Sequence, residues 1–419
     1  MPNMPDGLAA LLWGIVTFSL LILIHEGGHF LAARFFGRKV HEFMVGLPGP
    51  ALRFHGKKTT YGITAIPFGG YVRVAGMEPG PEDPLLGPVL AAITRHGSAT
   101  AAQIALELDL DEEEVEGALV ILADWDALEQ PSKKDGGIFH ARFDPGLAND
   151  PGALLDQARS VTYRALPVWK RTTMLCAGPA VNLIVAVLVF TVVVSSYGVL
   201  TTKISEVASG SAAEEAGIVA QDRITRIGDK KIGSWNSLVT EVAKYDAGES
   251  IDVGYERDGA TKTVKVALKE NPETKTGFLG VSPSLEKPTL VQALAESMSY
   301  VGLTFSAVLQ FFNPRTAGAA LSQSSSVIGA SYMAAGAARQ GALQYASLVA
   351  MLSLSLGVVN VFPIPPLDGG KIAIEVVQRF RKRELPRNLT LGLSAAGAVL
   401  LFALIGYLVC ADIVKYIIR

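Results

Sequence analysis

The sequence has little charge and almost no cysteine. Only 18% of its 419 residues are Asp, Glu, Lys or Arg, and 49% are hydrophobic, whereas a soluble chain of this length usually carries about a quarter charged residues. The net charge of −2 gives no global indication of nucleic-acid binding. Cys176 and Cys410 both lie in apolar segments, which excludes a disulfide framework and a cysteine metal site.

The deficit in charge is concentrated in four apolar runs, at about 8–36, 174–199, 346–362 and 389–413. Each approaches the roughly 20 residues that cross a bilayer core. The first run has no basic segment before it and no small-residue cleavage site, so we expect a membrane span there and not a cleavable signal. The sequence predicts a polytopic α-helical membrane protein with about four transmembrane helices, at 7–36, 172–199, 345–371 and 389–414.

Basic residues gather in the loops that follow the first and third spans. They are Arg34, Arg38, Lys39, Arg53, Lys57, Lys58, Lys170 and Arg171 in one loop, and Arg379, Arg381, Lys382, Arg383 and Arg387 in the other. The positive-inside rule places both loops in the cytoplasm. We therefore expect a multi-pass protein of the inner (cytoplasmic) membrane, with both termini and residues 200–345 outside.

Three titratable residues interrupt the first apolar run, in "LILIHEGGHFLAARF" (21–35). His25 and His29 lie one helical turn apart, so two imidazoles can converge on one metal ion, and Glu26 can take a proton from a metal-bound water. This is the H-E-x-x-H arrangement of zinc hydrolases, which needs a third protein ligand and an open position for water. The alternatives are a chance match or a polar cluster that joins helices. Ionisable residues inside a span cost several kcal/mol and are functional by default, which favours the metal.

The third run ends in "NVFPIPPLDGGK" (360–371). Its three prolines must break the helix, because proline lacks the backbone donor and clashes with the preceding turn. Irregular backbone at membrane depth is tolerated only where protein or a water-filled cavity covers it. Asp368 stands at this break and, if both spans run to the cytoplasmic face, at the depth of His25. It is the best candidate for the third ligand, and the alternative is a carboxylate that caps a helix after a proline turn.

"HEGGH" together with "NVFPIPPLDGG" resembles the site-2 proteases, which are intramembrane zinc metalloproteases, and the order of parts is similar to the bacterial regulator-of-sigma-E protease branch. The resemblance implies Zn²⁺ bound by His25, His29 and Asp368, with Glu26 as catalytic acid and base. It also implies that Asn360 assists catalysis by steadying the substrate or the oxyanion, although an interhelical hydrogen bond is the alternative.

Two further segments resemble the family. "TAIPFGGYVRVAGM" (64–77), in the region 40–80, alternates apolar residues around Gly69–Gly70, which predicts a β-hairpin. The resemblance implies that this membrane-associated hairpin presents the substrate in extended form, with Gly69, Gly70 and Tyr71 in contact with it, whereas an ordinary connecting hairpin is the alternative. In "CAGPAVNL" (176–183), Asn182 lines the substrate cavity or serves packing alone.

Residues 200–285 have a soluble α/β texture and resemble a bacterial PDZ domain, which binds a peptide by strand addition. The stretch "SIDVGYERDGATKTVKVAL" predicts a hairpin across Asp258–Gly259. Residues 289–313 carry apolar side chains at helical spacing, which predicts an amphipathic helix on the membrane surface or against the spans.

Residues 87–131 depart from the family pattern. Their apolar spacing predicts three short helices, similar to a winged helix-turn-helix, and Asp109 or Asp111 is expected to cap the third. Residues 87–130 contain ten acidic residues and one basic residue, Arg95. A phosphate-binding face needs lysine and arginine, so we expect a protein partner and no nucleic acid.

The function that combines these features is hydrolysis of a peptide bond within or near the transmembrane helix of a membrane-protein substrate, in a lipid environment. Anti-sigma factors or remnant signal peptides are the substrates that the resemblance implies. A metal transporter is one rival, but it predicts ligands nearer mid-span, several carboxylates and no Glu beside the first His. A catalytically dead scaffold is another, and the intact residues at 25, 26, 29 and 368 oppose it.

Overall fold

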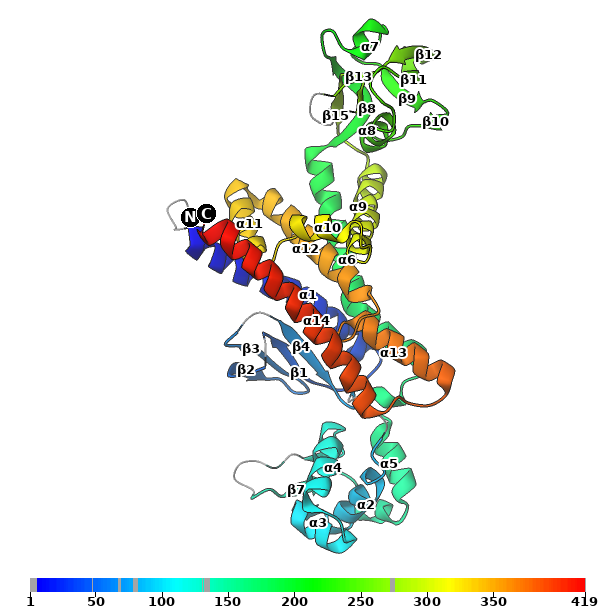
Figure 1. Ribbon diagram of the computed structural model, residues 1–419. Helices are drawn as coiled ribbons and strands as arrows, with labels where there is room; N and C mark the ends of the chain where they lie inside the picture. Colours follow the sequence, from blue (N-terminus) through cyan, green and yellow to red (C-terminus); the bar gives the residue numbers. More distant parts are fainter. Residues whose placement is uncertain are drawn as a thin grey trace. The chain divides into compact units, whose positions relative to one another are not determined.

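The structure is a computed structural model that describes residues 6–46, 48–66, 69–77, 82–129, 131, 136–271 and 276–418. It divides into two compact units, residues 1–187 with 300–419, and residues 188–299 (Figure 1). The first unit contains a small sheet and a helical module in addition to long apolar helices. The second is built around a larger sheet.

Among the described residues, four helices are long and apolar enough to cross a membrane. They are α1 (Asp6–Phe35), α6 (Val168–Tyr197), α12 (Ala342–Val361) and α14 (Arg387–Ile413). At 1.5 Å per residue, even the 20 residues of α12 extend about 30 Å, the thickness of a bilayer core. Large apolar side chains of α14, such as Val399, Leu400 and Phe402, are exposed, as expected where lipid is the neighbour. The four predicted helices are confirmed, and the chain is a membrane-embedded protein.

The third span ends earlier than predicted. α12 stops at Val361 instead of continuing to 371, and α13 (Asp368–Arg381) begins after a non-helical turn. The prolines in the turn cannot continue the helix. A Cβ at Gly369 would collide with the backbone of Val361 and Phe362, so only glycine lets α13 start so close to the end of α12. The break thereby places Asp368 at the first residue of a helix.

Small residues let the apolar helices approach closely. A Cβ at Gly28 of α1 would lie 2.9 Å from the Cα atom of Gly178 on α6, and a Cβ at Gly357 of α12 would lie 3.1 Å from the carbonyl oxygen of Pro179. Ser353 of α12 also donates a hydrogen bond to the carbonyl of Asn182 (3.0 Å). Close backbone approach of this kind is how helices gain packing energy where lipid removes the hydrophobic drive. It brings α1 and α12 onto the same stretch of α6.

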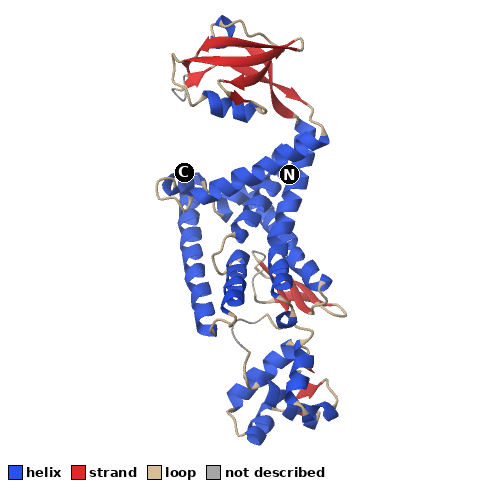
Figure 2. Cartoon of the chain, turned by 90° about the vertical axis from the view of Figure 1, so that its right-hand side faces the viewer, coloured by secondary structure: helices blue, strands red, loops and turns tan. Residues whose placement is uncertain are grey.

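A four-stranded sheet contacts α1 (Figures 1 and 2). Its strands are β1 (Val40–Val45), β2 (Ala51–His55), β3 (Thr60–Thr64) and β4 (Gly70–Val74), in the order β2-β3-β1-β4. β2 pairs antiparallel with β3, and β1 pairs parallel with β3 and antiparallel with β4. Among the described strands β4 pairs with β1 alone, so one of its edges is open.

The predicted hairpin around Gly69–Gly70 is wrong in its pairing. The strands on either side of this turn, β3 and β4, do not pair with each other, because β1 lies between them. Alternation of apolar residues identifies strands but not their partners. Gly69 adopts φ +109°, and its carbonyl accepts a hydrogen bond from the Gly46 amide (2.6 Å), which ties the start of β4 to the end of β1.

The inserted module contains the three predicted helices, α2 (Leu86–His96), α3 (Ala101–Leu108) and α4 (Glu112–Asp124). Short strands β5 (Ser98–Ala99), β6 (Leu128–Glu129) and β7 (Phe139–Ala141) form a sheet in the order β5-β7-β6. Asp111 caps α4 by accepting from the Glu113 amide, whereas Asp109 ends α3 in a left-handed conformation. The likeness to a winged helix-turn-helix stays a prediction.

The predicted end of the module at 131 is too early. After the 3₁₀ helix η1 (Pro145–Asn149) comes α5 (Pro151–Arg159). Phe139, Leu154 and Ala158 are buried in the same core as Leu119 and Trp125. These later residues complete a core that three short helices cannot close alone, so the module extends to 159. A second 3₁₀ helix, η2 (Tyr163–Ala165), leads into α6.

The second unit holds an α/β domain at 199–286, close to the predicted 200–285. Its sheet follows the order β12-β11-β9-β8-β15, with β10 paired to β9. The strands are β8 (Val199–Val207), β9 (Arg223–Ile227), β10 (Lys230–Lys231), β11 (Ser250–Arg257), β12 (Ala260–Ala267) and β15 (Val281–Glu286), accompanied by the pair β13 (Lys269–Glu270) and β14 (Gly277–Phe278) and by helices α7 (Ala212–Glu215) and α8 (Trp235–Val242). The predicted hairpin across Asp258–Gly259 is confirmed, with both residues at positive φ, as a two-residue turn of this type requires.

Three further helices complete the chain between the domain and α12: α9 (Leu290–Gln310), α10 (Ala317–Gln323) and α11 (Val327–Gln340). α9 corresponds to the helix predicted at 289–313. Asp412, near the end of α14 and buried, accepts hydrogen bonds from the amides of Ser326 (2.6 Å) and Gly329 (3.1 Å). The carboxylate therefore holds the start of α11, which packs against α1.

A buried ion pair in the α/β domain gives a test of its stability. Asp222 is 1% exposed and accepts two hydrogen bonds of 2.7 Å from the Arg257 guanidinium. Burial opposes ionisation, but the bonds from Arg257 outweigh it and lower the pKa of Asp222. At pH 7 Asp222→Asn should lower the free energy of unfolding of this domain, because it removes the charge-assisted hydrogen bonds between the buried carboxylate and Arg257.

The loss should diminish as the pH falls from about 4 towards the lower pKa of folded Asp222. In that range the unfolded chain binds a proton that the folded domain does not, so the wild-type protein loses the stability that the ion pair gives it. Denaturant-dependent hydrogen exchange of residues 199–286 in the full-length protein measures it. Asp252→Asn, at an exposed site on β11, is the matched control. Equal stability of the two variants at pH 7 would contradict the assignment.

Candidate metal centre

Three predicted ligands meet at one point. His25 and His29 project from α1, and Asp368 is the first residue of α13. The Asp368 Oδ2 atom lies 3.1 Å from His25 Nε2 and 3.2 Å from His29 Nε2. Each residue can offer one donor atom so that all three lie within 4.8 Å of one another. Two imidazole nitrogens and a carboxylate oxygen are a donor set that suits zinc, with a fourth position left for water.

Both imidazoles are oriented by groups on α6. The Met174 carbonyl lies 2.8 Å from His29 Nδ1, and since a carbonyl only accepts, Nδ1 carries the proton and Nε2 is free to bind a metal. The Asn182 side chain lies 3.2 Å from His25 Nδ1 through its nitrogen. The Asn182 Oδ1 atom is buried and has no hydrogen-bond partner among the described residues. With the amide turned by half a rotation, Oδ1 accepts from a protonated His25 Nδ1, so both residues fit a metal on Nε2.

Gly178 is a residue that the sequence reasoning missed. A Cβ at this position would lie 2.8 Å from His29 Cε1 and 2.9 Å from His25 Cε1. A glycine is therefore required where α6 passes the two imidazoles. The signal was present in "CAGPAVNL", because a small residue inside an otherwise apolar helix marks close approach of a neighbour.

A cavity of about 170 Å³ adjoins the three donors. Glu26 lines it from α1, and Gly70 and Tyr71 line it from β4. A Cβ at Gly70 would lie 3.2 Å from the Glu26 Cγ atom and 3.0 Å from the Met44 carbonyl oxygen. The strand therefore passes so close to the glutamate that a larger residue than glycine would be crowded here. The structure thus brings Glu26, Gly70 and Tyr71 together with the metal donors, while Gly69 is not among the residues that line the cavity.

Asn360 is placed differently. It is buried near the end of α12, and its side-chain amide donates a hydrogen bond to the Leu356 carbonyl of the same helix (3.0 Å). It does not line the 170 Å³ cavity. The bond is neither the predicted catalytic contact nor the interhelical alternative, so the role of Asn360 stays a prediction.

Lys371 is a second residue that the sequence reasoning missed. Its ammonium lies 3.5 Å from Asp368 Oδ1, and it lines the cavity beside the donors. The two residues are three apart on α13, the spacing at which helical side chains become neighbours. The motif "LDGGK" therefore contained this pair.

α13 is anchored two turns after Asp368. The buried Glu375 carboxylate accepts a hydrogen bond from the Tyr163 hydroxyl (3.2 Å) and lies 3.3 Å from an Arg171 nitrogen at the foot of α6. Burial raises the pKa of Glu375, and Arg171 opposes that rise. These contacts tie α13 to the first turn of α6, so the helix that carries Asp368 is fixed relative to the helix that holds the imidazoles.

Comparison with known proteins shows which family the chain resembles. The sequence matches Peptidase family M50 over residues 13–404. Zinc metalloprotease RasP of Geobacillus kaustophilus is 26% identical over 99% of this chain and 100% of its own length. A protein of Lactococcus lactis named "Putative zinc metalloprotease LL2128" is 27% identical over 96% of this chain and 97% of its own length.

Among solved structures, the PDZ domain of an SdrC-like protein of Listeria monocytogenes is similar to part of the chain, with a TM-score of 0.18 and 17% identity over 20% of this chain and 86% of that one. The family match covers most of the chain, including the part of α1 that carries the histidines and the turn after α12. This chain belongs to Peptidase family M50, the site-2 proteases, and is a zinc metalloendopeptidase.

Proposed function

We propose that this protein cleaves a peptide bond within or next to a transmembrane helix of its substrate. The observation that carries the proposal is the position of the donor set. His25, His29 and Asp368 converge at the end of an apolar helix long enough to span a membrane, and Glu26 lines the same cavity. We assign the three donors as the zinc ligands and Glu26 as the catalytic acid and base.

Zinc held in this way supplies a Lewis acid that lowers the pKa of a water molecule and polarises the scissile carbonyl. Glu26 takes a proton from the attacking water while the water oxygen bonds to the carbonyl carbon. Glu26 then gives the proton to the amide nitrogen as the carbon–nitrogen bond breaks, so one water is consumed and the carboxylate is regenerated. We further propose that Asn360 steadies the substrate or the oxyanion, which requires its amide to leave the Leu356 carbonyl.

A transmembrane helix hides its carbonyls in its own hydrogen bonds, so the substrate must unwind before hydrolysis. β4 is an edge strand and passes Glu26 at Gly70, and an unwound segment can add to the unpaired edge of such a strand. We propose that Gly69, Gly70 and Tyr71 hold the segment in this way. The Asn182 amide, at hydrogen-bond distance from His25, supports the metal ligand beside it and is proposed to border the substrate.

The distribution of basic residues supports an inner-membrane location with the zinc site near the cytoplasmic face and the domain at 199–286 on the opposite side. That domain has an apolar groove of about 250 Å³ between α8 and β14–β15, which suits a peptide or a chain end. Anti-sigma factors and remnant signal peptides are the substrates proposed from the family resemblance. A protein partner is proposed for the acidic module.

Replacing Glu26 with Gln should separate chemistry from metal binding. Glutamine keeps the shape but cannot accept the proton, so cleavage of a single-span substrate should fall at least a hundredfold. Zinc content should stay at the wild-type level because the three ligands are intact. Cleavage in proteoliposomes and metal analysis of the purified protein check both, with Glu256→Gln on β11 as an exposed control. Wild-type activity of Glu26→Gln would contradict the assignment of Glu26 as the catalytic acid and base.

Gly178→Ala should remove the metal. The added methyl group would lie within 3 Å of both imidazoles, so one of them must turn away from Asp368. We expect zinc content to fall below half of the wild-type value and cleavage to fall with it. Gly27→Ala is the matched control, because Gly27 lies beside Glu26 but a Cβ there meets no atom within 4 Å. Full zinc occupancy in Gly178→Ala would refute the close-approach argument.

Asn182 should act on zinc affinity through His25. Asn182→Ala removes the acceptor for Nδ1–H and should weaken zinc binding about 10- to 100-fold. Asn182→Asp retains an acceptor oxygen and should bind zinc at least as tightly as Asn182→Ala. Chelator competition on the purified protein measures the affinities without reference to cleavage. Equal affinity of wild type and Asn182→Ala would leave Asn182 with a packing role alone.

A further inference from the structure

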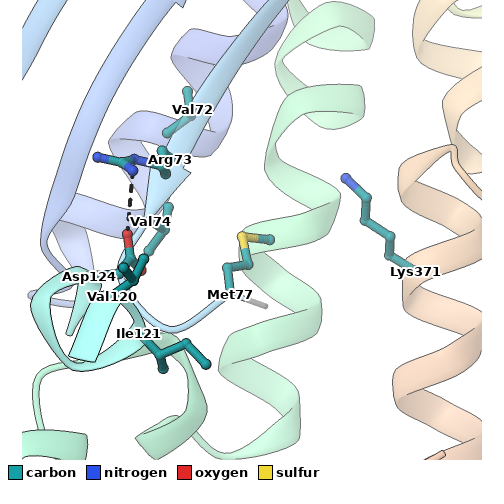
Figure 3. Close-up of a pocket in the computed structure, with 8 residues that line it drawn as sticks. All are labelled: Val72, Arg73, Val74, Met77, Val120, Ile121, Asp124 and Lys371. Atoms are coloured by element: carbon teal, nitrogen blue, oxygen red, sulfur yellow. Dashed lines mark ion pairs between the residues drawn. The ribbon is translucent and has the colours of Figure 1, made fainter. Parts of the chain in front are cut away.

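A second cavity, of about 500 Å³, lies where the inserted module meets β4 (Figure 3). β4 and the residues after it supply Val72, Arg73, Val74 and Met77, α4 of the module supplies Val120, Ile121 and Asp124, and α13 supplies Lys371. Val72, Val74, Met77 and Lys371 also line the cavity beside the zinc donors. The two cavities are therefore neighbours along one strand, and only the second receives side chains from the module.

The end of α4 is fastened to the sheet at this point. The Asp124 carboxylate accepts a hydrogen bond from the Gly76 amide (3.2 Å) and lies 3.8 Å from an Arg73 nitrogen (Figure 3). His41 of β1 donates to the Asp124 backbone carbonyl (2.5 Å). Lys39 forms an ion pair with Asp126. Contacts with β1 and with the end of β4 thus hold α4 beside the strand that borders the zinc site.

Val120 is oriented away from the core of its own module. Its neighbours Val115, Leu119 and Leu122 are buried in that core, whereas Val120 is 50% exposed and faces the 500 Å³ cavity. The rest of the exposed face of α4 is acidic, with Glu113 and Glu116. The apolar part of this face therefore coincides with the part that lies next to β4.

We propose that α4 forms the outer wall of the substrate groove and that the occupant is an extended segment of the substrate. The inference rests on the proposed function. A segment paired with the open edge of β4 at Gly70, beside Glu26, would continue along the strand past Val74. Four residues at about 3.3 Å each cover about 13 Å, so the wall contacts a side chain about four residues from the cleaved bond, on the side of the module.

The chemistry of the lining selects an apolar side chain there. Val72, Val74, Met77, Val120 and Ile121 supply hydrocarbon. The charged groups at the cavity already have partners, since Arg73 lies by Asp124 and Lys371 by Asp368. A charged substrate residue would lose water without gaining a free counter-charge. Alternation along a strand means that only every second substrate residue reaches α4.

Disulfide trapping tests the contact directly in the full-length protein. The background is Glu26→Gln with Cys176→Ala and Cys410→Ala, so that substrate stays bound and no native thiol competes. Val120→Cys should form disulfides with single cysteines placed in a single-span substrate three to five residues from the cleavage site, with a two-residue period. Leu106→Cys is the matched control, because Leu106 is 88% exposed on α3 and lines neither cavity.

Substrate preference gives a readout that a purely structural role would not move. Wild type should prefer Leu over Asp at the contacted substrate position by at least tenfold in kcat/KM, the range expected for one apolar pocket. Val120→Lys should reduce that preference at least fivefold, while Leu106→Lys should leave it unchanged. An unchanged preference in Val120→Lys, or disulfides no stronger than those of Leu106→Cys, overturns the inference.

The two proposals fail in different ways. If the cysteine-free enzyme with Glu26 intact cleaves a single-span substrate but Val120→Cys traps nothing, the function stands and the outer wall is wrong. If that enzyme cleaves no single-span protein while it retains zinc, the proposed function is overturned and this inference with it.

Discussion

The close approach of α1 and α6 is the constraint on which the proposed zinc site depends. Gly28 and Gly178 let the two backbones pass at a distance that no side chain would permit. The imidazoles of His25 and His29 then reach α6, whose Met174 carbonyl and Asn182 amide orient them. Helices in lipid gain little from burying apolar surface, so close packing of small residues both joins them and fixes the ligand geometry.

The position of the third donor, Asp368, depends on the break between α12 and α13. α12 ends at Val361, and after the proline turn a new helix begins at Asp368, whose carboxylate meets both imidazoles. α13 is then fastened through Glu375 to Tyr163 and Arg171. Irregular backbone is tolerated here because the turn is covered by protein: a Cβ at Gly397 of α14 would collide with the Pro365 carbonyl. β4 also has unpaired backbone groups, because it is the edge strand of its sheet. An unwound substrate would need such backbone partners.

The inserted module lies next to this site but contributes none of the three metal donors. Its surface is acidic, and a phosphate-binding face needs lysine and arginine, so the expectation of a protein partner stays a prediction that its charge favours. The contacts of Asp124 with the sheet and the position of Val120 at the cavity instead place one face of α4 along the substrate path. On the proposed mechanism, an insertion of this kind can change which sequences are cleaved while His25, His29, Asp368 and Glu26 stay the same, because the two cavities are neighbours.

The sequence by itself determined the features that depend on neighbours in the chain: four apolar helices, two histidines and a glutamate on one of them, a proline break before Asp368, and the charge of the module. Tertiary structure alone decided the pairing of β4 with β1, the end of the module at 159, and the close contact of Gly178 with both imidazoles. The physical reason is range. Periodicity and helix breaking act over a few residues, whereas the pairing of Met44 with Tyr71 and the approach of Gly28 to Gly178 join residues that lie in different elements, far apart in the sequence.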